Sequence, residues 1–180
     1  MKKTIIVNLF GGPSTGKSTL CAGLFTELKV RGIDCEMGRE YVKDLVWEES
    51  FKKIQNQQYI FGKQHNILFR LNDKVDVVIT DSPLLLSTVY YKGNNPHFAD
   101  NVLWEFNNLN TLNYYLDRTF TYVENGRMQT AEQAKQVDEV CLNLLNEKNI
   151  SYKRISPGLE SLPEIVIDII LKMNDDKSDI

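Results

Sequence analysis

The stretch NLFGGPSTGKSTLCAGL, residues 8–24, decides the fold because it contains the pattern G-x-x-x-x-G-K-[ST]. The pattern runs through Gly11, Gly12, Pro13, Ser14, Thr15, Gly16, Lys17 and Ser18, and Thr19 follows it. Glycines at these places let the backbone fold around a phosphate chain with its N–H groups pointing inward. A helix that starts at the end of the pattern directs its positive end at the same anion. The pattern therefore predicts a phosphate-binding loop.

The chain on either side of the pattern has the character that such a loop requires. Residues Thr4–Phe10 form a short, continuous apolar run, which is typical of a parallel strand buried on both faces. Residues Gly16–Arg31 carry Leu20, Leu24 and Leu28 at helical spacing. Strand, glycine-rich turn and helix follow one another in the order that confirms a phosphate-binding loop in P-loop proteins.

The two residues that end the pattern indicate what the loop binds. Lys17 can reach the β- and γ-phosphates of a nucleoside triphosphate, and the Ser18 hydroxyl can ligate Mg²⁺. We therefore expect ATP and Mg²⁺ as cofactors, with the residues from Gly11 to Thr19 binding the nucleotide.

The composition is that of an ordinary globular domain. The chain has 180 residues, of which 42% are hydrophobic and 25% charged, and its net charge is −3. This charge argues against nucleic-acid or membrane binding that is driven by charge alone. Three cysteines (Cys21, Cys35 and Cys141) lack metal-ligand spacing, so we expect free thiols and a cytoplasmic protein. No apolar run reaches the length of a membrane span.

Strand-like and helix-like segments alternate after the loop. The expected strands are 33–37, 74–80, 110–116 and 150–155. The expected helices are 41–49, 51–72, 84–91, 98–108, 130–148 and 162–173. This alternation predicts an α/β fold, a three-layer sandwich with a mostly parallel sheet of five strands, with the functional residues at the carboxyl ends of the strands. We expect residues 1–173 to form a single domain and 174–180 a polar C-terminal tail.

Two carboxylates follow expected strands and are candidates for the chemistry. Asp81 comes after VVIT, where an acid can hold Mg²⁺ through water, although it is also a common turn residue before Pro83. Glu40 lies in GREY and can accept a proton from a substrate hydroxyl, or simply favour the start of a helix. No glutamate follows Asp81, which shifts the weight of the argument from an ATPase to a kinase.

Arg118 and Arg127 lie between the strand expected at 110–116 and the helix expected at 130–148. Arginines near a strand tip can form a lid that neutralises the charge of a transferring phosphoryl group. The sequence does not choose between the two. Thr130 and Gln133 match a capping box, which explains part of this segment structurally. On the helix expected at 51–72, the polar residues that can flank an acceptor are Gln58, Gln64, His65 and Asn66.

These motifs together resemble the small P-loop kinases. The stretches GGPSTGKSTL, GREYV, FGKQHN and VVITDSPLL, with a late arginine lid, are most similar to the ribosylnicotinamide kinase domain of the NadR-like group. That group belongs to the wider AAA_28-type ATP-binding domains, which include many short phage and bacterial proteins. The resemblance implies the P-loop nucleoside triphosphate hydrolase fold, with a parallel sheet in the order 2-3-1-4-5.

The resemblance also implies roles for particular residues. Gly11–Thr19 would hold ATP, Asp81 would serve Mg²⁺ or the acceptor hydroxyl, Glu40 would lie by the acceptor, and Arg118 and Arg127 would belong to the lid. The family usually has an acid followed by Thr or Arg where this chain has Asp81-Ser82-Pro83. The acceptor therefore does not follow from the resemblance.

The sequence favours an ATP- and Mg²⁺-dependent kinase of a nucleoside or nucleotide, with Lys17, Asp81, Glu40, Arg118 and Arg127 as catalytic candidates. Two alternatives remain open. The acceptor can be an end or a modified base in DNA or RNA, or the protein can be a P-loop ATPase or switch that acts on a protein partner. No membrane partner is expected, and a homodimer is compatible with the sequence.

Overall fold

The computed structural model describes residues 4–119, 122 and 130–178. In this part of the chain, one sheet of five strands runs in the order β2-β3-β1-β4-β5, and every pair of neighbours is parallel. The strands are β1 (Ile5–Phe10), β2 (Cys35–Gly38), β3 (Val77–Thr80), β4 (Asn110–Leu116) and β5 (Lys153–Ile155). The predicted α/β class and the strand order 2-3-1-4-5 are confirmed.

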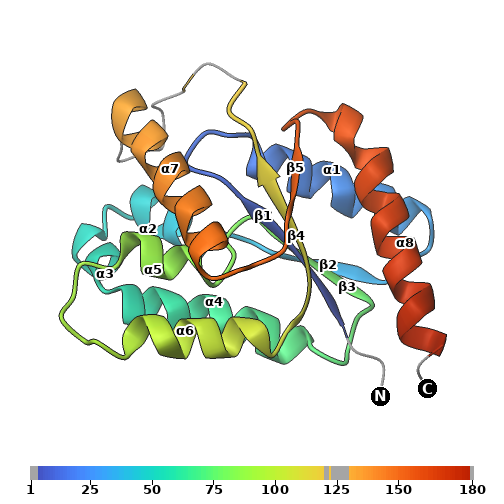
Figure 1. The fold of residues 1–180 in the computed structure, drawn as a ribbon, viewed down its shortest axis with the longest axis horizontal. Coiled ribbons are helices and arrows are strands. Elements are labelled where there is room, and N and C mark those ends of the chain that lie inside the picture. Colours follow the sequence, from blue (N-terminus) through green and yellow to red (C-terminus); the bar gives the residue numbers. More distant parts are fainter. Residues whose placement is uncertain (1–3, 120–121, 123–129, 179–180) are drawn as a thin grey trace.

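Helices cover both faces of the sheet and complete a three-layer sandwich (Figure 1). The helices are α1 (Lys17–Val30), α2 (Tyr41–Trp47), α3 (Phe51–Gln55), α4 (Gln57–Leu71), α5 (Leu86–Tyr90), α6 (Phe98–Asn107), α7 (Ala131–Glu147) and α8 (Leu162–Ser178). A 3₁₀ turn, Leu159–Ser161, precedes α8. Helices α1 and α8 pack on one face, and α4, α6 and α7 pack on the other.

Strand β1 explains this layering because it is buried along its whole length. Successive side chains of a strand point to opposite faces of the sheet. Ile5, Val7 and Leu9 accordingly pack with α1 and α8, whereas Ile6 and Phe10 pack with α6 and α7. A strand that packs against two cores buries both of its faces, and β1 is apolar at every position except Asn8, whose side-chain amide donates a hydrogen bond of 2.9 Å to Asn113 Oδ1.

The helix expected over residues 51–72 is in fact two helices, α3 and α4, separated at Asn56. Asn56 has φ −86° and ψ 83°, which no helix tolerates, and its side chain accepts a hydrogen bond from the Tyr59 backbone N–H. A short amide side chain competes with the helical backbone for hydrogen bonds and caps the new helix instead. The sequence pattern missed this break because apolar residues continue on both sides of Asn56.

Two boundaries near the end of the chain also differ from the predictions. Strand β5 is shorter than the segment 150–155, and it pairs only with Tyr114–Leu116. Helix α8 continues past residue 173 to Ser178, so most of the expected polar tail is helical. Within that extension, Asp176 accepts a hydrogen bond of 2.7 Å from the Asn110 side chain.

Helix α7 begins as predicted, with both hydrogen bonds of the Thr130–Gln133 capping box present. Its buried residues are Ala134, Cys141 and Leu145. Val140, although apolar, lies outside this buried stripe and is 49% exposed.

The three cysteines are buried and form no disulfide. Among the described residues, every helix is too short or too polar to cross a lipid bilayer.

Candidate active site

The predicted phosphate loop lies at the carboxyl end of β1 and leads directly into α1. Gly16, the residue before α1, has φ +91°, a backbone conformation that side-chain-bearing residues rarely adopt. No side chain caps the first turn of α1. The loop therefore presents the positive end of a helix of 14 residues at the edge of the sheet, which is the geometry that binds phosphate groups.

Lys17 crosses the loop. Its ammonium group donates hydrogen bonds to the backbone oxygens of Gly11 (2.8 Å) and Gly12 (2.7 Å). The positive charge is thus held against the inner side of the loop by neutral carbonyl groups. Because an anionic phosphate oxygen is a stronger acceptor than a carbonyl, the ammonium can exchange these bonds for bonds to a triphosphate.

Ser18 and Asp81 meet beside Lys17 and suit a magnesium ion. The Ser18 hydroxyl donates a hydrogen bond of 2.6 Å to Asp81 Oδ2, and the Asp81 residue is only 7% exposed. Magnesium prefers oxygen ligands and is usually bound by one or two protein groups together with substrate phosphates. A hydroxyl and a carboxylate in contact, next to a phosphate loop, are a donor set of this kind.

Asp81 also connects the loop to Glu40. The backbone N–H of Glu40 donates a hydrogen bond of 3.0 Å to Asp81 Oδ1. This bond ties the tip of β2 to the tip of β3, and Glu40 stands immediately before α2. The structure therefore brings Lys17, Ser18, Asp81 and Glu40 to one edge of the sheet, as the sequence predicted.

Of the four polar residues suggested on the long helix, only Gln64 is buried beside these strand tips, with 2% of the residue exposed. Its amide nitrogen makes two long hydrogen bonds, to the Gly38 oxygen (3.3 Å) and to Thr80 Oγ1 (3.4 Å). Its amide oxygen is buried and has no hydrogen-bond partner. The amide is therefore weakly held for a buried polar group.

Arg118 lies on the other flank of the loop, just after β4. Its guanidinium group binds Asp138 of α7 through Nε and Nη2, and Nη2 also donates to the Pro13 oxygen (2.8 Å). Its third nitrogen, Nη1, is buried and has no hydrogen-bond partner. Arg127, the other candidate for the lid, falls outside the described residues.

Sequence reasoning missed Asp138. Its Oδ1 accepts a hydrogen bond of 2.7 Å from the backbone N–H of Gly12, across 126 residues of sequence. A signal was nevertheless present, because Asp138 stands in the buried stripe of α7 at helical spacing between Ala134 and Cys141. A charged residue in such a stripe requires a partner.

Helix α7 approaches the loop so closely that Gly12 must be glycine. A Cβ at this position would overlap the Asp138 carboxylate and lie 2.8 Å from the Ala134 backbone oxygen. We expect Gly12→Ala to lower the free energy of unfolding by about 1–3 kcal/mol, the usual range for overpacking. ATP binding should weaken by about tenfold or more, because the loop must shift.

Gly62→Ala is the matched control for this substitution. Gly62 lies within α4, and a Cβ there has no heavy atom within 4 Å. This change should raise the free energy of unfolding by about 0.5–1 kcal/mol, because alanine favours a helix. Thermal unfolding and equilibrium ATP binding measure both effects. A Gly12→Ala protein as stable as the wild type would contradict the close contact between α7 and the loop.

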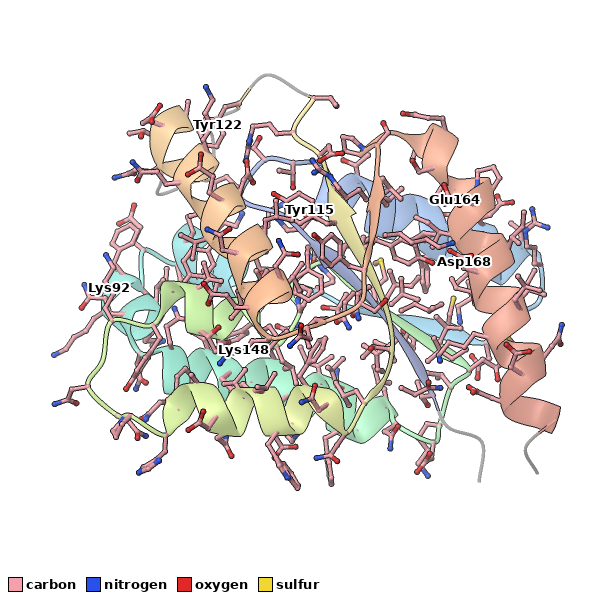
Figure 2. The ribbon with its side chains drawn as sticks, viewed as in Figure 1. Lys92, Tyr115, Tyr122, Lys148, Glu164 and Asp168 are labelled. Atoms are coloured by element: carbon pink, nitrogen blue, oxygen red, sulfur yellow. The ribbon has the colours of Figure 1, made fainter. Side chains whose placement is uncertain are left out.

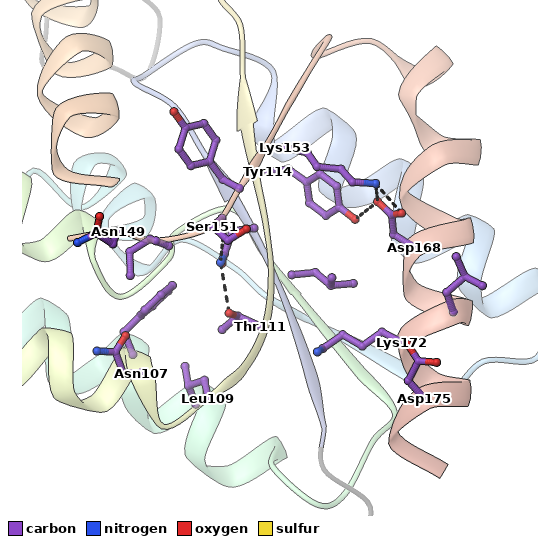
Figure 3. Close-up of a pocket in the computed structure, with 16 residues that line it drawn as sticks. Asn107, Leu109, Thr111, Tyr114, Asn149, Ser151, Lys153, Asp168, Lys172 and Asp175 are labelled. Carbon is purple, nitrogen blue, oxygen red and sulfur yellow. Dashed lines mark hydrogen bonds and ion pairs between the residues drawn. The ribbon is translucent and has the colours of Figure 1, made fainter. Parts of the chain in front are cut away.

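A cavity of about 520 Å³ lies at a different place, against the first half of β4 (Figure 3). Thr111 and Asn113 line it, whereas the phosphate loop contacts the far end of β4 at Leu116. On its α8 side, Asp168 accepts a hydrogen bond from the Tyr114 hydroxyl. This cavity is therefore separate from the phosphate loop and from Asp81 and Glu40.

Comparisons with known proteins agree with this geometry. The family model AAA_28, described as an AAA domain, matches residues 6–161. A structure of deoxyadenosine kinase from M. mycoides with bound dATP is similar, with a TM-score of 0.56 and 15% sequence identity. A second structure of that enzyme, with the products dCMP and a flexible dCDP, gives a TM-score of 0.57, also at 15% identity. Each match covers 92% of this chain and 98% of the other chain.

The comparison with curated proteins gave no match. At 15% identity the solved structures establish the fold alone, and the family model covers most of the chain. The chain belongs to the AAA_28 family of AAA domains, and its fold is similar to that of the deoxyadenosine kinase structures.

Proposed function

We propose that this protein is a kinase that transfers the γ-phosphoryl group of ATP, with Mg²⁺, to a nucleoside or nucleotide. The observation that carries this proposal is the position of Asp81, which accepts hydrogen bonds from Ser18 and from the backbone of Glu40. One buried carboxylate thereby links the residue beside the ATP phosphates to the residue that would face the acceptor.

The proposed roles follow from charge and position. Lys17 and the first turn of α1 would bind the phosphates, and Ser18 with Asp81 would hold Mg²⁺, which neutralises charge on the phosphate oxygens. Glu40 or Asp81 would orient the acceptor hydroxyl and take its proton. Arg118 and Arg127 would add positive charge near the transferring group. Most of the rate enhancement would come from positioning and electrostatics.

A nucleobase on the acceptor is supported by Gln64. Its amide is buried next to the tips of β2 and β3, its two hydrogen bonds are long, and its oxygen has no partner. An amide presents a donor and an acceptor side by side, which matches the edge of a base. The two solved structures described above are of a deoxyadenosine kinase, so nucleosides are the first class to test. The buried free thiols support a reducing, cytoplasmic setting.

The test is a measurement of ADP production from ATP and Mg²⁺ with a panel of deoxynucleosides, ribonucleosides, nucleoside monophosphates and short oligonucleotides. The proposal predicts that one small acceptor raises ADP production far above the rate without acceptor, with a matching phosphorylated product. If only oligonucleotides raised ADP production, the result would favour an end or a base of DNA or RNA as the phosphoryl acceptor. One slow rate with every addition would overturn the kinase proposal in favour of an ATPase or switch.

A further inference from the structure

Asp138 and Arg118 form a compact cluster against the phosphate loop, which we name the loop clamp. The Asp138 carboxylate binds the Gly12 N–H at 2.7 Å and Arg118 Nε at 2.5 Å, and Arg118 Nη2 binds the Pro13 oxygen at 2.8 Å. Only 14% of the Asp138 side chain and 15% of the Arg118 side chain are exposed. The clamp therefore holds two consecutive residues of the loop, Gly12 and Pro13.

The carboxylate is held at this point by the packing of α7. The Tyr115 hydroxyl donates a hydrogen bond of 3.1 Å to the backbone oxygen of Asp138, and Figure 2 shows Tyr115 between β4 and α7. One turn earlier, the Ala134 oxygen lies against Gly12. One turn later, the Cys141 thiol lies beside the Gly11 backbone. Burial raises the pKa of this thiol to about 11, and the hydrogen bond with the Gly11 backbone acts in the opposite direction. These contacts fix the backbone of α7 beside the loop on both sides of Asp138.

The sign of the Asp138 charge makes this contact unusual. A phosphate loop binds anions through its backbone N–H groups, and here a carboxylate of the protein occupies one of them. A triphosphate would bring several more negative charges to the same short loop, and like charges at short range in a partly buried site repel each other strongly. Arg118 offsets the charge of Asp138 at direct contact.

We propose that Asp138 is an internal anion of the phosphate loop, which stabilises the loop but opposes binding of ATP, and that Arg118 neutralises it. This inference rests on the proposed function only in that the loop must bind a nucleoside triphosphate. The interaction would affect two properties of that same site in opposite directions: Asp138 makes the loop more stable and lowers its affinity for ATP. Asp138 acts through the loop backbone and through Arg118, so it is a positioning residue.

The proposal predicts opposite changes in stability and affinity, which a purely structural role does not. Asp138→Asn keeps an oxygen that can accept the Gly12 N–H bond and removes the charge. We expect the melting temperature to fall by roughly 3–6 °C, because the buried Arg118 loses its partner. The Kd of Mg²⁺–ATP should become about three- to tenfold tighter, because the negative charge beside the loop is gone. A purely structural role would make both properties worse.

The double variant gives the second test. Arg118→Met leaves Asp138 without a counter-charge, so the Kd should weaken by about tenfold or more. Adding Asp138→Asn to Arg118→Met should bring the Kd back to within about threefold of the wild type. If Arg118 served ATP only by its own contact with the phosphates, the double variant would stay as weak as Arg118→Met. That result would overturn the proposal.

Binding is measured calorimetrically without an acceptor, and melting is followed for each protein. Glu139→Gln, which removes the same charge from the exposed neighbour of Asp138, should change neither property. If Asp138→Asn does not fold, Asp138→Ser keeps an oxygen acceptor and carries the same expectation. Weaker or unchanged ATP binding by the uncharged variants, with normal binding by the wild type, overturns the inference alone. A wild type that does not bind ATP overturns the proposed function as well.

Discussion

Lys17→Ala is expected to lower the rate of phosphoryl transfer by about 10³-fold or more while the protein remains folded. Removing a single donor that stabilises charge in a transition state typically costs about 10²–10³-fold, and Lys17 would also contribute to ATP binding. The fold should survive because the ammonium donates hydrogen bonds to backbone oxygens of the loop, those of Gly11 and Gly12. Neither oxygen belongs to a helix or strand.

The measurement is ADP production with the best acceptor, at saturating ATP and over a range of ATP concentrations. Lys148→Ala is the matched control, because it removes the same charge from an exposed residue at the far end of α7. The control should keep the rate and the melting temperature of the wild type. If Lys17→Ala turned over as fast as the control, the assignment of the phosphate loop would be wrong.

The part of the site that the sequence predicted consists of residues whose roles depend on local spacing. The phosphate loop has fixed offsets between its glycines, Lys17 and Ser18, so a pattern finds it without knowledge of the fold. Asp81 and Glu40 were found because they follow strands, and parallel strands end at the same edge of a sheet. The hydrogen bonds from Ser18 and from the Glu40 backbone to Asp81 show that these residues do meet at that edge.

The features that the sequence did not reveal depend on contacts between distant segments. The bond between Asp138 and Gly12 joins residues 126 positions apart, so helical spacing can place Asp138 in the buried stripe of α7 but cannot identify its partner. The same limit explains Val140, which is apolar and exposed. At Asn56 the reason is different: its side chain accepts a hydrogen bond from the Tyr59 backbone and starts a new helix within a stretch that has apolar residues on both sides.

Asp81→Asn is expected to reduce phosphoryl transfer by about 10²-fold or more and to make the reaction require about tenfold more Mg²⁺. The substitution keeps the shape of the side chain and one oxygen, which can still accept the hydrogen bond from the Glu40 backbone. It removes the negative charge that faces Ser18, and with it the strongest protein ligand proposed for the metal. The fold should therefore persist while the dependence on the metal changes.

A titration with Mg²⁺ at fixed ATP separates this effect from a general loss of activity. If Asp81 served only as the general base, its substitution would lower the maximal rate but leave the Mg²⁺ concentration needed for half of that rate unchanged. Asp100→Asn, an exposed acid in the first turn of α6, is the control for the change of charge. A variant of Asp81 with the rate and magnesium dependence of this control would contradict both roles proposed for Asp81. Since Asp81 is the residue that connects the ATP side to the acceptor side, that outcome would remove the main support for phosphoryl transfer.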